Sequence, residues 1–313
     1  MKTFGPKTKQ PPIIFFGNEQ IAHGINTYIT PTLESLIDAG YNIVAVFTSP
    51  DFVAKRGKKL ESVRTKQIAL MHDISVYQPT NKKELEDAVI TVVNNTTLKP
   101  VGVLESYGHI IPNKVLELFE PHGIINIHPS LLPKYRGATP IETAMLNDDR
   151  ATGVSIIKLT SEMDAGPIYA QQTITLTGHE TKDELYNQLS NLGAKLLIGS
   201  LPAITSGKLR IAEQDDAKAT YCSKLTTSMS PLNAAQKTAR QLVCQVRAFA
   251  GFPKSKLVIA GLNCTITQAS ESVVKITTID QQCLDGKYLV IEKLIPPSGK
   301  EMTALDFING YLR

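Results

Sequence analysis

The chain has 313 residues, of which 42% are hydrophobic and 20% are charged, and its net charge at pH 7 is +4. This composition excludes a disordered chain, and no apolar run approaches the roughly 20 residues that a membrane helix requires. The first residues lack the apolar stretch of a secretory signal, so we expect a cytoplasmic protein. The mild positive charge permits an anionic partner where it is clustered.

Apolar runs alternate with amphipathic segments through the first two thirds of the chain. Such alternation predicts a doubly wound, mostly parallel α/β sheet of the Rossmann-like type, with the last two strands paired antiparallel. The longest helix is expected to begin with a capping box of Thr181 and Glu184. The expected strands are 13–17, 42–47, 74–76, 101–104, 123–127, 153–159 and 167–174, and the expected helices are 32–39, 64–71, 82–93, 114–119, 139–147 and 181–204.

The pattern changes after Leu209, where a polar and charged stretch predicts a linker. A helix over 233–249 and short strands separated by turns follow, which favours a small OB-like β-barrel. The strands are expected at 257–259, 264–267, 273–277 and 288–291. We therefore expect an N-terminal domain over 1–211, a linker over 212–219 and a smaller C-terminal domain over 220–313.

Two absences in the sequence exclude common classes of site. After the first strand only Gly17 of a G-x-G-x-x-G fingerprint is present, which disfavours a nicotinamide or flavin cofactor. No two of the four cysteines form a C-x-x-C pair, so we expect free thiols and no metal site.

An amide, an imidazole and a carboxylate carry the strongest chemical signal. Asn126 and His128 lie two residues apart on an expected strand, so their side chains share one face. Asp164 lies in a turn before Ala165 and Gly166, where an isolated aspartate would commonly be structural. Together the three groups can polarise a carbonyl, stabilise an oxyanion and move a proton.

Two further segments have both a binding and a structural interpretation. The cluster at 55–59 is a basic loop, either phosphate-seeking or simply solvated. In the loop at 130–137 two prolines bracket Leu131 and Leu132, which form either a wall for a flat apolar ligand or a loop tucked under its neighbours.

These residues resemble the folate-dependent formyltransferases. The resemblance rests on the Asn/His/Asp set, the S-L-L-P-x-Y-R-G loop and the D-A-G turn. The resemblance is closer to the branch of the family that acts on methionyl-tRNA, and it covers nearly the whole chain. The segments that resemble that branch are 46–51 with the basic loop at 56–60, the S-Y-G-H-I-I-P segment at 106–112, the T-Y-C-S-K-L segment at 220–225 and the P-P-S-G-K-E-M ending at 296–302.

The resemblance implies a formyltransferase fold and transfer of a formyl group from the cosubstrate 10-formyltetrahydrofolate to the amino group of initiator methionyl-tRNA. Asn126, His128 and Asp164 would be catalytic. The implied folate-binding residues are Ser106, Tyr107, Gly108, Ile110, Ile111, Pro112, Ser130, Leu131, Leu132 and Pro133, and the implied tRNA-binding residues are Lys55, Arg56, Lys58, Lys59 and Arg136. The C-terminal domain would bind tRNA, and we expect a monomer that needs no metal and no membrane.

Departures from the family pattern keep alternatives open. Pro129 stands where the tRNA enzymes usually have glycine, which favours formyl transfer to an amino sugar nucleotide. The I-D-W segment expected after Lys224 is missing, and the chain has no tryptophan. A non-catalytic tRNA-binding relative is the other alternative, which the intact Asn/His/Asp set opposes.

Overall fold

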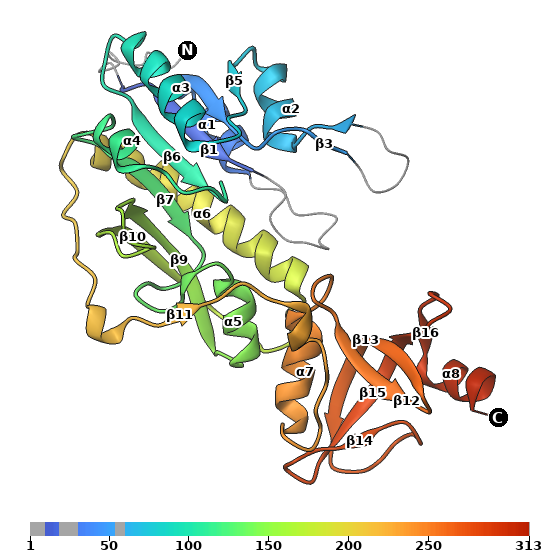
Figure 1. The fold of residues 1–313 in the computed structure, drawn as a ribbon. Coiled ribbons are helices and arrows are strands. Elements are labelled where there is room, and N and C mark those ends of the chain that lie inside the picture. Colours follow the sequence, from blue (N-terminus) through green and yellow to red (C-terminus); the bar gives the residue numbers. More distant parts are fainter. Residues whose placement is uncertain (1–9, 19–30, 54–59, 313) are drawn as a thin grey trace, which may run out of the picture.

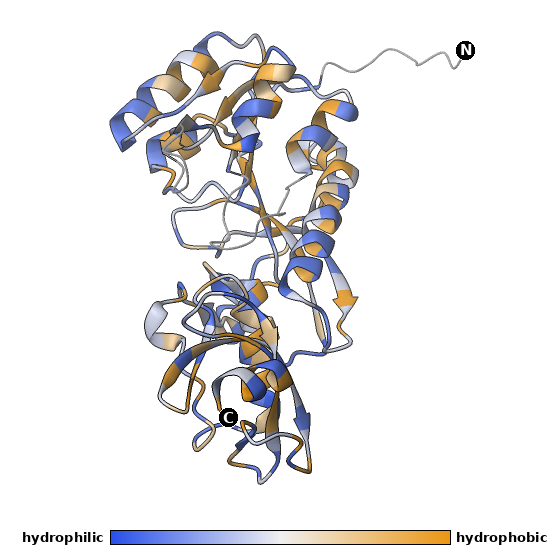
Figure 2. Cartoon of the chain, turned by 90° about the vertical axis from the view of Figure 1, so that its right-hand side faces the viewer, coloured by the Kyte–Doolittle hydropathy of each residue, from blue (hydrophilic) through white to orange (hydrophobic). Residues whose placement is uncertain are grey.

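The computed structural model describes residues 10–18, 31–53 and 60–312, which form two lobes (Figure 1). The first lobe holds a seven-stranded sheet, and the second holds a five-stranded one. In the side view of Figure 2 the lobes lie one above the other, and the helices carry both hydrophilic and hydrophobic stretches. No described helix is long and apolar enough to cross a membrane.

The large sheet has the strand order β10-β9-β7-β6-β1-β2-β5. Neighbours from β7 to β5 are parallel, whereas β9 pairs antiparallel with both β7 and β10. The chain winds outward from β1 through β2 to β5 and then returns to β6, so the order reverses between β1 and β6. Ligands of doubly wound sheets bind at such a reversal. The strands are β1 (Ile13–Gly17), β2 (Ile43–Phe47), β5 (Val76–Tyr77), β6 (Val101–Glu105), β7 (Ile124–His128), β9 (Ala151–Lys158) and β10 (Ile168–Thr175).

Helices cover both faces of this sheet because its central strands are apolar on both sides. One core cluster joins the sheet to α1, α2, α5 and α6, and another joins the opposite face to α3 and α4. The predicted capping box of α6 is present, with Thr181 and Glu184 bonded reciprocally. The helices are α1 (Thr32–Asp38), α2 (Arg64–Met71), α3 (Lys82–Asn94), α4 (Asn113–Glu117), α5 (Pro140–Leu146) and α6 (Lys182–Thr205).

The second lobe is an antiparallel sheet in the order β12-β13-β15-β14, with β16 added on β15. It forms a half-barrel with a core of its own, on which α7 packs. The fold class expected from the sequence, a Rossmann-like sheet followed by a smaller OB-like β domain, is confirmed. The elements are α7 (Ala239–Ala248), β12 (Ser255–Ile259), β13 (Leu262–Ser272), β14 (Gln281–Gln282), β15 (Tyr288–Ile295), β16 (Met302–Thr303) and α8 (Ala304–Tyr311).

Two expected elements of this lobe differ from the structure, and one helix was not expected. The helix over 233–249 begins only at Ala239, because Thr238 and Gln241 form a capping box there. The strand over 273–277 does not form, and its hydrophobic side chains are exposed instead of packed. The helix α8 was not expected from the sequence, although Thr303 caps it through the backbone N–H of Asp306.

The segment between α6 and α7 runs back along the first lobe before it enters the second (Figure 1). Ala212 exchanges backbone hydrogen bonds with Ile168 at the β10 edge. Further along, β11 (Tyr221–Cys222) pairs in parallel with β8 (Arg136–Gly137) of the first lobe. The expected linker is therefore attached to the first lobe over much of its length.

Candidate active site

The three residues proposed as catalytic come together at the carboxyl end of the large sheet. Asn126 and His128 extend from β7 and are almost fully buried. Asp164, in the turn between β9 and β10, places Oδ1 3.5 Å from Asn126 Nδ2 and Oδ2 3.6 Å from His128 Nδ1. These separations are long for hydrogen bonds, so the carboxylate holds neither donor tightly and both can engage a third group.

The other nitrogen of His128 fixes the orientation of the ring. His128 Nε2 donates to the backbone carbonyl of Tyr135 at 2.9 Å, which requires a hydrogen on that nitrogen. Nδ1 is consequently the nitrogen that faces Asp164 and the open side of the site. Tyr135 itself adopts a positive φ of 62°, and its hydroxyl donates to Asp149 at 2.8 Å.

The Asp164 carboxylate has a second, tighter anchor. The backbone N–H of Gly137 donates to Oδ2 at 2.8 Å, which leaves Oδ1 directed toward Asn126. Gly137 has a φ of 121°, and a Cβ there would lie 2.3 Å from the carbonyl oxygen of Cys222. Only glycine fits this position, because β11 passes directly against it.

Arg136 lies in an internal network, although the sequence interpretation assigned it to tRNA. Its side chain is only 2% exposed, and it donates to Gln214 from Nε and Nη2 at 3.0 and 2.9 Å. It also pairs with Asp216 at 2.7 Å and donates to the hydroxyl of Tyr221. A guanidinium so occupied has little to offer to a phosphate, and the structure favours a structural use.

The first proposed folate segment follows β6, at the reversal of strand order. Ser106 and Gly108 both have positive φ, so the chain turns sharply here. Tyr107 points inward and packs edge-on against Phe16, and burial raises the pKa of its hydroxyl to about 12. Ile110 is 75% exposed, whereas Ile111 is buried and Pro112 precedes α4. The segment therefore presents an apolar side chain at the edge where ligands of such sheets bind.

The second proposed folate segment follows β7 and is fixed to the sheet. Ser155 donates to the Ser130 carbonyl at 2.6 Å and accepts from the Leu132 N–H at 3.1 Å. Leu132 is buried, and Leu131 lies against the backbone of β9. Pro133 follows in a cis peptide bond. Leu132 thus fits the interpretation of a loop tucked under its neighbours, whereas the half-buried Leu131 keeps part of its apolar side chain exposed.

Two polar residues of this region were missed at the sequence level. Asn18, directly after β1, accepts from Thr48 and from the Ser49 N–H at 2.7 Å each and donates to the Tyr107 carbonyl. It ties together the ends of three strands, and its place after Gly17 was the available signal. Gln214 holds the Asp164 turn, and nothing in its polar surroundings distinguished it.

Other expected features lie away from these residues. The proposed tRNA-binding residues Lys55, Arg56, Lys58 and Lys59 fall outside the described residues. All four cysteines are free and buried. Cys222 lies next to the site. Burial raises the pKa of its thiol, which disfavours the reactive thiolate form.

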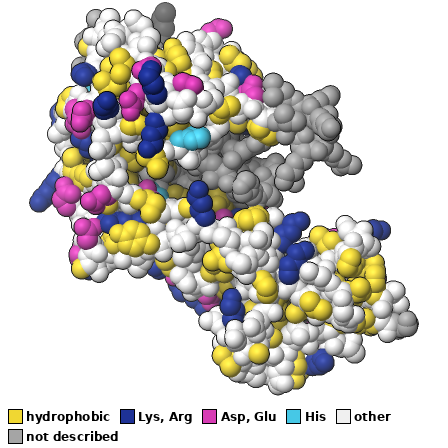
Figure 3. All heavy atoms as spheres, in the orientation of Figure 1, with side chains coloured by type: hydrophobic (Ala, Val, Ile, Leu, Met, Phe, Trp, Pro, Cys, Tyr) yellow, Lys and Arg dark blue, Asp and Glu magenta, His cyan; other side chains and the backbone are white. Residues whose placement is uncertain are grey.

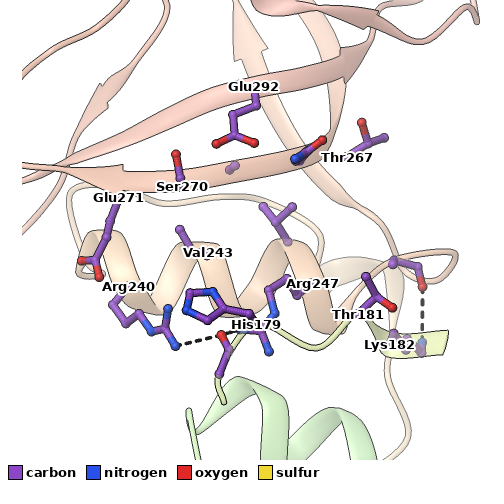
Figure 4. Close-up of a pocket in the computed structure, with 15 residues that line it drawn as sticks. His179, Thr181, Lys182, Arg240, Val243, Arg247, Thr267, Ser270, Glu271 and Glu292 are labelled. Atoms are coloured by element: carbon purple, nitrogen blue, oxygen red, sulfur yellow. Dashed lines mark hydrogen bonds between the residues drawn. The ribbon is translucent and has the colours of Figure 1, made fainter. Parts of the chain in front are cut away.

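A cavity of about 640 Å³ lies between the lobes, and none of the three proposed catalytic residues lines it (Figure 4). It is bounded by the turn before α6, by α7 and by the faces of β13 and β15. Two of its cations join the lobes: Arg240 pairs with Asp148, and both Arg240 and Arg247 donate to the carbonyl of Gly178. These two guanidinium groups therefore stabilise the interface between the lobes.

Known proteins share the sequence pattern and the fold of this chain. Residues 14–201 match the formyl transferase family. The methionyl-tRNA formyltransferases of Dictyoglomus thermophilum and Methylococcus capsulatus are 35% and 34% identical, and each alignment covers 96% of both chains. The crystal structure of an N-formyltransferase from Helicobacter canadensis, in complex with folinic acid and dTDP-3-aminofucose, has a TM-score of 0.65 at 19% identity over 89% of this chain and 98% of that one, which shows a shared fold. The chain belongs to the formyl transferase family, within the branch of the methionyl-tRNA formyltransferases.

Proposed function

We propose that this protein transfers the formyl group of 10-formyltetrahydrofolate to the amino group of initiator methionyl-tRNA. Membership of the family supports the reaction and its acceptor. The observation that carries the chemistry is the meeting of Asn126, His128 and Asp164 at separations of 3.5 and 3.6 Å. Formyl transfer to nitrogen needs a site that stabilises an oxyanion and moves a proton, and these groups can do both.

The reaction forms a bond between the methionyl amino nitrogen and the formyl carbon, and it breaks the bond between that carbon and N10 of the folate. One proton leaves the amino nitrogen, and one reaches N10. The Asn126 amide and a protonated Nδ1 of His128 donate to the oxyanion of the tetrahedral intermediate. Asp164 orients both groups and assists the proton transfer. Each donor can contribute about 3–4 kcal/mol to transition-state stabilisation.

The folate would lie at the carboxyl ends of β6 and β7. The exposed Ile110 and the half-buried Leu131 offer apolar surface to its ring, and backbone groups of 106–112 and 130–133 offer hydrogen bonds. The charge developed in the reaction is met by an amide and an imidazole, so we propose a mechanism without a metal. Activity that survives dialysis against a chelator is the expected result.

We propose that tRNA contacts the basic cluster at 55–59 and exposed lysines of the second lobe. Of the lobe's cations, Arg240 and Arg247 are engaged at the lobe interface, whereas Lys224 and Lys254 are exposed. On the face shown in Figure 3, Lys and Arg side chains are scattered over both lobes. Replacing Arg56 and Lys58 with alanine should raise the KM for tRNA and leave that for folate unchanged.

The division into domains at 1–211, 212–219 and 220–313 also remains our proposal, as do the cytoplasmic location and the monomeric state. Separate cores in the two lobes support the division. Ala212 and β11 are both bonded to the first lobe, so the linker packs on the catalytic region and does not hang free between the lobes.

The decisive assay supplies 10-formyltetrahydrofolate with either methionyl-tRNA or an amino sugar nucleotide and follows formyl transfer. We expect transfer to methionyl-tRNA, with turnover at least about a hundredfold lower in Asn126→Ala and in His128→Ala. Asn191→Ala, an exposed amide on α6, is the matched control. Transfer only to the sugar would assign the chain to the alternative that Pro129 favours, and normal turnover in both variants would remove the proposed oxyanion site.

A further inference from the structure

The side-chain amide of Gln214 uses its full hydrogen-bonding capacity between the Asp164 turn and Arg136. Nε2 donates to the backbone carbonyls of Asp164 at 2.8 Å and Gly166 at 2.7 Å. Oε1 accepts from Nε and Nη2 of Arg136 at 3.0 and 2.9 Å. Two donors and two acceptor sites are all that a carboxamide possesses, so the side chain is fully satisfied between the turn and the guanidinium.

These bonds close a ring around the proposed catalytic carboxylate. Gln214 holds the backbone of Asp164 and is held by Arg136. The next residue, Gly137, donates its N–H to Oδ2 of Asp164 at 2.8 Å. The turn is thus fixed twice, once through the carbonyl of Asp164 by Gln214 and once through its carboxylate by Gly137 of β8.

Asp164 needs such support because its backbone has a φ of 51°. This left-handed conformation costs most non-glycine residues about 1–2 kcal/mol and is better tolerated by aspartate, so contacts that fix it determine how firmly the turn is held. Among residues 211–218, Gln214 is half-buried while its seven neighbours are exposed. One side chain of an otherwise exposed segment therefore reaches in to hold the turn.

We propose that Gln214 is a positioning residue, which holds the Asp164 turn so that the carboxylate is aimed at Asn126 and His128. The proposal rests on the proposed function insofar as Asp164 is catalytic. Gln214 makes no hydrogen bond to Asn126 or His128 in the described part of the chain, so it acts through Asp164. Its contribution is to turnover more than to binding, because the oriented carboxylate matters most in the transition state.

Two substitutions test whether Gln214 positions the Asp164 turn or only ties the linker to Arg136. In Gln214→Glu the carboxylate still accepts from Arg136, but it has no donor for the carbonyls of Asp164 and Gly166 and repels them. Gln214→Met removes both sets of bonds at similar volume. We expect kcat to fall about tenfold or more in both variants, with KM for either substrate changed less than threefold. Gln188→Glu, an exposed site on α6, is the control for the same change of charge.

A double-mutant comparison tests whether Gln214 acts through Asp164. In an Asp164→Asn background, Gln214→Glu should lower kcat no further, because the group it positions is already lost. Additive losses, or normal kcat in Gln214→Glu, would overturn the proposal.

Hydrogen–deuterium exchange supplies a readout that does not depend on the acceptor substrate. Amides at 160–167 should exchange faster in Gln214→Glu than in the wild type and in Gln188→Glu. Unchanged exchange there would refute positioning even if activity fell. Faster exchange in a protein that proved inactive toward methionyl-tRNA would refute the proposed function and leave the positioning role standing.

Discussion

Replacing the buried carboxyl of Glu105 should change how stability depends on pH. Glu105 is the last residue of β6, and Oε2 is buried without a hydrogen-bond partner among the described residues. Burial raises the pKa of this carboxyl to about 7 from an ordinary value of 4.5, and the neighbouring Thr32 hydroxyl offsets only part of the increase. The folded protein therefore binds this proton more tightly than the unfolded chain does.

The sign and the size follow from these two values. Below pH 4.5 the carboxyl is protonated in both states and has no effect. Between pH 4.5 and 7 the unfolded chain ionises while the folded state keeps the proton, so stability is lost; above pH 7 both states ionise and the loss levels off. The loss is about 3 kcal/mol by pH 8, of which about 2.5 kcal/mol falls between pH 5 and pH 8. Glu105→Gln cannot ionise and should not show it.

The assay is urea unfolding followed by circular dichroism at pH 5, 6, 7 and 8. An unpartnered amide in Glu105→Gln carries a cost of its own, about 1–3 kcal/mol at every pH, so the diagnostic quantity is the slope. We expect the wild type to lose stability relative to Glu105→Gln as pH rises. Glu117→Gln, an exposed carboxyl on α4, should follow the wild type. Parallel wild-type and Glu105→Gln curves from pH 5 to 8 would refute the reasoning.

Three further predictions concern a buried ion pair, the lobe interface and the anchor of the Asp164 carboxylate. Lys182→Met should lower the free energy of unfolding by about 3–5 kcal/mol, because Glu142 Oε1 stays buried without Lys182 Nζ, which lies 3.0 Å away in the wild type. A urea titration measures the loss. A second change, Glu142→Leu, should restore most of it. Arg240→Ala and Asp148→Ala should each destabilise the protein by about 1–3 kcal/mol, because the pair joins the lobes through two hydrogen bonds. A double-mutant cycle should show that the two effects are coupled, and additive effects would contradict a direct interaction. Gly137→Ala should reduce kcat at least tenfold in the formyl-transfer assay while the protein stays folded, since a Cβ would displace the N–H that binds the proposed catalytic carboxylate of Asp164. Normal kcat would show that the carboxylate needs no such anchor.

The sequence predicted best where one signal dominated. Buried apolar runs marked β1, β2 and β6, and the capping box at Thr181 marked the start of α6. The same-face spacing of Asn126 and His128 was a local property of an extended strand, and the structure brings both beside Asp164. These features depend on nearest neighbours in the chain, which a sequence displays directly.

Features that depend on tertiary contacts could not be predicted in this way. Residues 273–277 have the β-branched composition of a strand, but no neighbouring strand pairs with them in the described structure, so propensity alone did not decide. The family resemblance assigned Arg136 to tRNA, and the sequence did not show its internal partners Gln214 and Asp216, which lie about eighty residues away. Gln214 gave no local signal for the same reason.

The pairing of β11 with β8 bears on how the two lobes can be separated experimentally. A cut placed at 211, where composition changes, would remove Gln214 and uncover Gly137 along with the second lobe. The resulting loss of activity would then be mistaken for a loss of tRNA affinity. A fragment that ends after Ser223 keeps β11 and the carbonyl that accepts from Thr139, so it retains every described hydrogen bond to Asp164. Modularity in this protein is set by which lobe a segment is bonded to, and the severable point lies about a dozen residues beyond the change in composition.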